Sequence, residues 1–215
     1  MKSQAARAVV PGRPTIIGEA ALSEASVITR SAPARRRTIL ADVVLVVDMV
    51  RGFCEEGHNL YVGPTIREII PKIQRLLRAE KKRGSHIIFL CDTHDPDDLE
   101  FQMFPPHCIR GTEEPEVIPE LQEFADEIIG KRRFSAFFDT NLEERLQELN
   151  PDKITIVGDC TNICVLYTAA DARDRDYRVE VPAECVATFD AGAHGFALEQ
   201  MRSVLGVEVT GASAY

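Results

Sequence analysis

The sequence has no apolar run long enough to cross a bilayer, and its first residues lack the apolar core of a secretory signal peptide. We therefore expect a cytoplasmic protein that is not embedded in a membrane. An excess of positive charge is also missing, because 25 Lys and Arg stand against 34 Asp and Glu, for a net charge of −9. General binders of nucleic acids or of anionic membranes need a basic surface, so neither is expected as a partner.

The chain also lacks internal repeats and any C-x-x-C pair among its six cysteines. A chain of 215 residues without an export signal can fold around a hydrophobic core and has little need of disulfides, so we expect reduced thiols. Cys160 and Cys164 as a redox pair or as metal ligands remain an alternative, although their spacing is not that of a C-x-x-C site.

The first 40 residues differ from the rest in charge. Seven of them are basic and two are acidic, and they show no clear hydrophobic period. We interpret residues 1–40 as a basic N-terminal extension and residues 41–215 as one folded domain. A docking arm, a partner-binding tail, an organellar transit peptide and a solvated extension would all fit the extension, and we prefer the last.

From residue 41 the hydrophobic pattern is regular. Buried strands are predicted at 43–47, 86–91, 127–129, 153–157, 177–181 and 207–209. Helices are predicted at 64–82, 142–149, 162–175 and 191–205. Strands that alternate with helices indicate a three-layer α/β/α fold around a mostly parallel sheet of six strands.

Polar and nucleophilic residues follow the first four predicted strands. They are Asp48 after the first, Cys91, Asp92 and His94 after the second, Lys131 after the third, and Cys160 and Cys164 after the fourth. Parallel strands bring their carboxyl ends to one edge of the sheet, and ligands bind beyond that edge. We therefore expect these side chains to form one site.

Cys164 is the candidate nucleophile of this site. It lies close to a predicted helix N-terminus, whose partial positive charge favours the thiolate, and the N–H groups of the turn can stabilise an oxyanion. Taken alone, a free cysteine is more often a small buried apolar residue. The arrival of Asp48 and Lys131 at the same edge favours a catalytic role.

These residues together resemble the isochorismatase-like cysteine hydrolases, and within them the nicotinamidases. The matching stretches are 46–53, 92–94, 104–112, 131–137 and 158–165, and the resemblance spans about residues 43–209. It implies a catalytic triad of Asp48, Lys131 and Cys164, with the N–H groups of Cys160 and Cys164 as the oxyanion hole. It also implies a cis peptide bond between Asp159 and Cys160, although family members usually carry a small apolar residue where Asp159 stands.

The resemblance further implies a metal site. Asp92, His94 and His107 match the nicotinamidase ligands, and Glu100 is similar to a further carboxylate ligand of some members. Imidazole and carboxylate ligands suit one divalent ion, zinc in the first place, with iron or manganese as alternatives. Read without the resemblance, these four are ordinary polar loop residues.

The same resemblance implies a class of substrate. Phe53, Phe104 and Phe134 match the wall of a pocket for a flat aromatic ring, with Leu60 and Tyr167 as further candidates; ordinary core packing is the alternative. The implied reaction is hydrolysis of nicotinamide to nicotinate and ammonia in NAD salvage. Another small amide as substrate, or a non-catalytic metal- or partner-binding module on this fold, remains open, and so does a homo-oligomer.

Overall fold

A computed structural model describes residues 42–211 of the chain, so the basic extension expected over residues 1–40 lies outside the described residues. Within residues 42–211, seven strands form one sheet in the order β3-β2-β1-β4-β5-β7, with β6 paired to β4. They are β1 (Val43–Val47), β2 (His86–Asp92), β3 (Glu127–Lys131), β4 (Ile154–Asp159), β5 (Val179–Pro182), β6 (Val186–Ala187) and β7 (Glu208–Thr210). All pairings between these strands are parallel.

The expectation of a parallel α/β sheet is confirmed, but its count of six strands was wrong by one. The additional strand, β6, has two residues, which is too short to show a hydrophobic period. It is defined by its pairing with the end of β4, where Asp159 lies beside Ala187.

The helices of the described part are α1 (Arg51–Cys54), α2 (Pro64–Arg83), α3 (Leu142–Leu149), α4 (Leu166–Asp174) and α5 (Ala191–Ser203). α1 is a single turn that the hydrophobic pattern did not reveal. The helix expected over 162–175 is instead divided into a π-helical turn, Thr161–Val165, and α4. Within residues 42–211, no helix is long and apolar enough to cross a membrane.

The sequence explains the bounds of α2. Pro64 occupies its first turn, where a missing N–H costs nothing, and Gly84 ends it in the left-handed conformation, with φ of 84°. Ile66, Ile73 and Leu77 lie on one face at helical spacing and are fully buried against the sheet. Burial of this face fixes α2 on the sheet.

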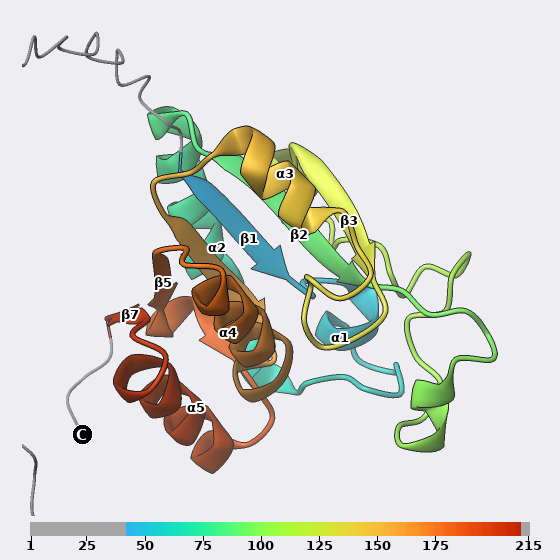
Figure 1. Cartoon of the computed structure of the whole chain (residues 1–215). Coiled ribbons are helices and arrows are strands. Elements are labelled where there is room, and N and C mark those ends of the chain that lie inside the picture. Colours follow the sequence, from blue (N-terminus) through green and yellow to red (C-terminus); the bar gives the residue numbers. More distant parts are fainter. Residues whose placement is uncertain (1–41, 212–215) are drawn as a thin grey trace, which may run out of the picture. The chain divides into compact units, whose positions relative to one another are not determined.

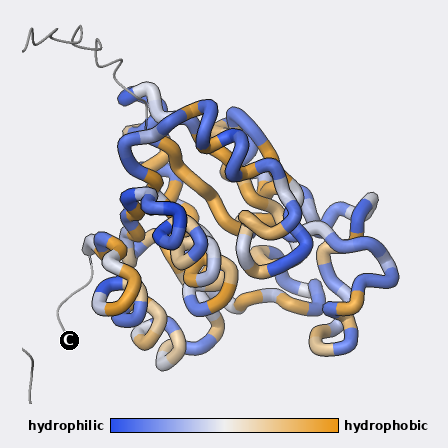
Figure 2. The backbone as a smooth tube through the Cα atoms, in the orientation of Figure 1, coloured by the Kyte–Doolittle hydropathy of each residue, from blue (hydrophilic) through white to orange (hydrophobic). Residues whose placement is uncertain are grey.

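The sheet separates two apolar cores. α2 covers one face, while α3 and α4 cover the opposite face (Figure 1). All five residues of β1 have no exposed surface, and the strands form hydrophobic stretches inside a more hydrophilic chain (Figure 2). A strand buried on both faces is continuously apolar, which is why β1 was visible in the sequence.

The strand register brings the carboxyl ends of four strands to one edge. Val47, the last residue of β1, pairs with Leu90 of β2 and with Gly158 of β4, and Asp92 pairs with Lys131 at the end of β3. The residues that follow these ends therefore meet beyond this edge of the sheet.

Candidate active site

Lys131 lies at the centre of a buried charged cluster at this edge. Its Nζ is 2.8 Å from Oδ2 of Asp48 and 3.3 Å from Oδ1 of Asp92, and it donates to Sγ of Cys164 at 3.5 Å. Asp48 and Lys131 have almost no exposed surface. The structure therefore brings together the three residues expected to form a triad.

The backbone holds Asp48 in a fixed orientation. Asp48 adopts a positive φ of 53°, its N–H donates to Leu90, and its Oδ1 accepts a hydrogen bond from the N–H of Asp92 at 2.9 Å. Oδ2 is left to face Lys131. Leu90 and Asp92 of β2 thus orient the carboxylate of Asp48, which directly follows β1.

The protonation states in the cluster suit a carboxylate acting as a base. Burial raises the pKa of Asp48 to about 6, although Lys131 opposes this shift. Burial also raises the pKa of the Cys164 thiol well above its usual value, again against Lys131. The free protein therefore holds a thiol at neutral pH, and a nearby base must remove its proton.

The pKa of Cys164 corrects one expectation from the sequence. A helix N-terminus was expected to favour the thiolate, but Cys164 lies inside the π-helical turn and its desolvation is the larger effect. The N–H groups of Ile163 and Val165 both donate to the carbonyl of Cys160, so the turn folds back on itself. The peptide bond between Asp159 and Cys160 is cis, as the resemblance implied.

A second cluster could hold a metal ion. Asp92, His94 and His107 are buried, and each offers a ligand atom within 4.8 Å of the others. Nε2 of His94 and Nε2 of His107 lie 2.9 and 3.2 Å from the same oxygen, Oδ2 of Asp92. Two imidazoles that converge on one carboxylate are a donor set that fits zinc, iron or manganese.

The outer nitrogens of both imidazoles also have suitable neighbours. Nδ1 of His107 donates to the carbonyl of Pro105 at 2.8 Å, and Nδ1 of His94 lies 3.1 Å from Oδ2 of Asp98. Asp98 is in turn bound by Arg133. Such contacts orient metal-binding histidines. Asp98 and Arg133 were not identified from the sequence, where they are two more charges in polar loops.

Glu100 lies just outside this cluster. Its Oε1 is 4.0 Å from Nε2 of His107, and its Oε2 is 3.6 Å from the guanidinium of Arg133. Asp92 is therefore the carboxylate that directly contacts both histidines. Glu100 faces the cluster as an outer, partly neutralised charge.

The two clusters line one cavity of about 300 Å³. Asp48 and Cys164 lie on its wall, and Asp92 and His107 line another part of it. The expected aromatic wall is present, since the lining includes Phe53, Phe104, Phe134 and Leu60. Tyr167 does not line the cavity but stacks behind Phe134, with ring centroids 5.8 Å apart.

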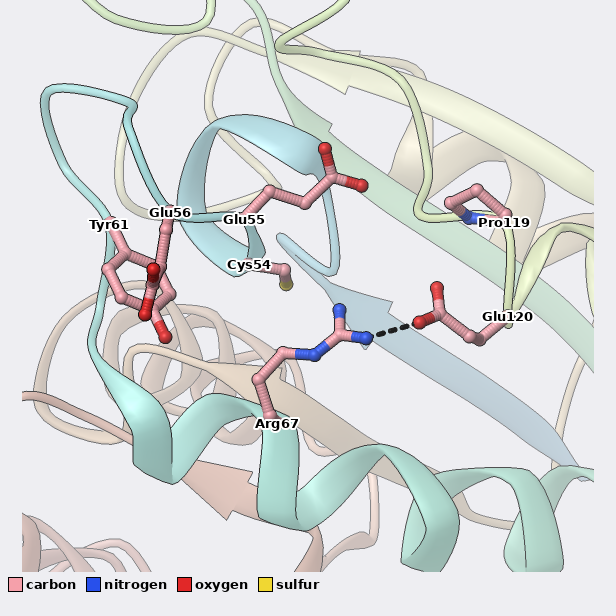
Figure 3. A pocket seen from close by; sticks show the side chains of 7 residues that line it. All are labelled: Cys54, Glu55, Glu56, Tyr61, Arg67, Pro119 and Glu120. Atoms are coloured by element: carbon pink, nitrogen blue, oxygen red, sulfur yellow. Dashed lines mark hydrogen bonds and ion pairs between the residues drawn. The ribbon is translucent and has the colours of Figure 1, made fainter.

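The cavity also has lining residues that were not selected from the sequence. They are Asn59, Tyr61, Val62, Asp159, Ile163 and Phe189. Tyr61 also lines a separate hollow of about 440 Å³ that contains no residue of the two clusters. Figure 3 shows this hollow, which the Arg67 guanidinium crosses to bind Glu120. The cavity lined by Asp48 and Cys164 is therefore the candidate active site.

Comparison with known proteins adds to this geometry. The model of the isochorismatase domain matches residues 42–213. The pyrazinamidase/nicotinamidase of Streptococcus mutans is 31% identical with a TM-score of 0.75, over 78% of this chain and 99% of that one. The pyrazinamidase of Pyrococcus horikoshii, solved in complex with zinc, is 29% identical with a TM-score of 0.73, over 79% and 98% of the chains. The N-carbamoylsarcosine amidase of Thermoplasma acidophilum is 29% identical with a TM-score of 0.70, over 78% and 94%.

Proposed function

Since the chain belongs to the isochorismatase family and is an amidohydrolase, we propose that it hydrolyses nicotinamide to nicotinate and ammonia. The observation that carries this proposal is the contact of Lys131 with Asp48 and Cys164 on the wall of the cavity that the metal-type cluster also lines. The triad supplies amide hydrolysis, and the second cluster supplies selectivity for a ring with a basic nitrogen.

The first half of the reaction forms a thioester. Asp48 accepts the proton of the Cys164 thiol, and the thiolate attacks the carboxamide carbon. The negative charge passes from Asp48 to Cys164 in this step, and the ammonium group of Lys131, which contacts both, compensates it throughout. The N–H groups of Cys160 and Cys164 stabilise the oxyanion, and Asp48 returns its proton to the leaving ammonia.

The second half releases the acid. Asp48 removes a proton from a water molecule, which attacks the thioester carbonyl, and the C–S bond breaks to release the acid. The departing Cys164 thiolate takes the proton from Asp48, which restores the thiol and the carboxylate. The carboxylate needs a pKa below the working pH for this step, and the value of about 6 for Asp48 meets that need.

Binding of the ring would use both parts of the cavity. Phe53, Phe104 and Phe134 would contact the faces and edges of a flat ring. Asp92, His94 and His107 would hold a divalent metal, which when bound supplies a Lewis-acid position for the pyridine nitrogen. Fixing the ring places the carboxamide next to Cys164, an effect of orientation that can contribute several kcal/mol.

A second candidate substrate is a small carbamoyl amide. The likeness to N-carbamoylsarcosine amidase favours it, because that protein has nearly the same structural similarity as the pyrazinamidases. The triad chemistry would be the same. The role of the metal-type cluster separates the two candidates, since only the pyridine amide has a ring nitrogen to bind. Nicotinamide hydrolysis would place the protein in cytoplasmic NAD salvage.

The test is ammonia release from nicotinamide by the purified protein, before and after treatment with a chelator. Cys164→Ala is measured beside it, with Cys185→Ala as the control, because Cys185 is buried away from the cavity. We expect turnover by the native protein and by Cys185→Ala. We expect its loss after chelation and in Cys164→Ala.

Other outcomes would change the proposal. Turnover that survives chelation but needs Cys164 would retain the triad and remove the metal from the reaction. Ammonia released from a carbamoyl amide but not from nicotinamide would retain the family chemistry and overturn the substrate.

A further inference from the structure

The cavity contains a carboxyl group that the proposed chemistry does not use. Asp159 is the last residue of β4, lines the cavity and is 1% exposed. Its Oδ2 is fully buried and has no hydrogen-bond partner among residues 42–211. Its Oδ1 has a single weak contact, with the thiol of Cys160 at 4.0 Å.

The neighbouring cation does not neutralise Asp159. Lys131 is bound at short distance by Asp48 and Asp92, and no ion pair joins it to Asp159 within the described part of the chain. Burial, and then the charge of Asp48, raise the pKa of Asp159 well above its usual value. Burial therefore favours the protonated form of Asp159, which offers one O–H donor and an acceptor oxygen.

Such a group is costly in the unliganded protein. Desolvation of a carboxyl group without a partner disfavours the folded state, whereas an apolar side chain at the same position would be favourable. β4 is otherwise apolar where it faces the cores, as in Ile154, Ile156 and Val157. A ligand that hydrogen-bonds to Asp159 would offset this cost and gain affinity.

The position of Asp159 limits which part of a ligand it can reach. Asp159 directly precedes Cys160, whose N–H is assigned to the oxyanion hole, and it lines the same cavity as Cys160 and Cys164. Phe53, Val62 and Phe189 supply apolar lining to the same cavity. A ring substituent near the carboxamide that enters this region finds Asp159 as a hydrogen-bonding group in a mainly apolar surrounding.

We propose that Asp159 determines specificity by hydrogen-bonding an amino or hydroxyl substituent of the substrate, so that the preferred substrate is a substituted small aromatic amide. This inference rests on the proposed function and narrows its substrate class. A cavity built to hydrogen-bond one substituent discriminates strongly against an analogue that lacks it, because the buried group is then left unpaired.

The experiment compares kcat/KM for nicotinamide with that for its 2-, 4- and 6-amino derivatives, in the native protein, Asp159→Leu and Asp159→Asn. We expect the native protein to prefer at least one amino derivative at least tenfold over nicotinamide. Asp159→Leu should lower this preference at least tenfold, mainly by raising kcat/KM for nicotinamide and lowering kcat/KM for the amino derivative. Asp159→Asn, which keeps a donor and an acceptor, should retain most of the preference.

Binding measurements separate this inference from the proposed function. The same amides are titrated calorimetrically into Cys164→Ala and into Cys164→Ala combined with Asp159→Leu. A preference for an amino derivative that disappears with Asp159→Leu supports the role of Asp159 even if no ammonia is released, in which case only the proposed reaction fails. The inference would be overturned if the preference for an amino derivative over nicotinamide agreed within twofold with and without Asp159→Leu, both in affinity and in kcat/KM. Nicotinamide hydrolysis itself would be unaffected by that result.

Discussion

At the scale of the residue, the buried ammonium of Lys131 is the feature on which the other charges depend. Burial alone would lower its pKa, but Asp48 and Asp92 raise it well above the usual value. Each carboxylate is tolerated in the interior because the cation lies between them. A buried ion pair of this kind is costly to break, since removal of one partner leaves an unpaired charge.

Lys131→Met is therefore expected to abolish turnover and to lower the free energy of unfolding by about 3–5 kcal/mol. Urea denaturation and ammonia release measure the two effects. Arg132→Met is the matched control, because Arg132 is 41% exposed and pairs with the exposed Asp139, an arrangement that contributes about 0–1 kcal/mol. Equal stability of the two variants would contradict the assignment of Lys131 as the central charge.

At the scale of the element, the site depends on the close approach of β1 and β4. Gly158 has a φ of +114°, and a Cβ built on it would lie 2.0 Å from the carbonyl oxygen of Val47. No side chain can occupy that space, so the two strands must separate if one is introduced. Asp159 and Cys160 follow directly, and a shift of the strand would displace them.

Gly158→Ala is expected to lower the free energy of unfolding by more than about 3 kcal/mol, or to prevent folding, because it combines a steric clash with an unfavourable φ. Gly195→Ala in α5 is the control. Outside the helix's own nearby backbone, no atom of the described residues lies within 4 Å of a Cβ added at Gly195. Alanine in a helix is favoured by about 1 kcal/mol over glycine. Thermal unfolding of both variants should thus shift in opposite directions, and a shift in the same direction would refute this account.

At the scale of the whole described domain, two apolar cores share one sheet. Ile73 of α2 belongs to one core and Leu146 of α3 to the other, and both are fully buried. Every residue of β1 contacts one of these cores or the other, so loss of either core exposes the same central strand. The two faces are expected to unfold together.

Ile73→Ala and Leu146→Ala should each cost about 2–5 kcal/mol, and the double variant should show the sum within about 0.5 kcal/mol, because the two side chains have no shared partners. Circular dichroism and tyrosine fluorescence should report one coincident transition; the chain has no tryptophan to serve as a probe. Two separate transitions would show that the faces unfold independently.

The fold could be predicted from the sequence because its signals are local. The apolar run of β1, the helical spacing in α2 and the glycine at 84 each act through neighbours along the chain. Most residues of the candidate active site could be predicted because they lie at or just after the ends of strands, and parallel topology brings the ends of those strands together. The short elements α1 and β6 have too few residues to show a period and were not predicted.

Burial and distance, by contrast, were decided only by the tertiary structure. Glu100 and Asp92 are both carboxylates in loops or at strand ends, yet only Asp92 contacts both histidines. Burial raises the pKa of both Cys164 and Asp159, and Oδ2 of Asp159 has no hydrogen-bond partner among the described residues. The sequence alone determined which chemical groups reach the edge of the sheet, because the apolar run of each strand and the polar residues that follow it are local features. The packing of the whole domain decided which of them lose water and which find a partner, because desolvation depends on all neighbours at once.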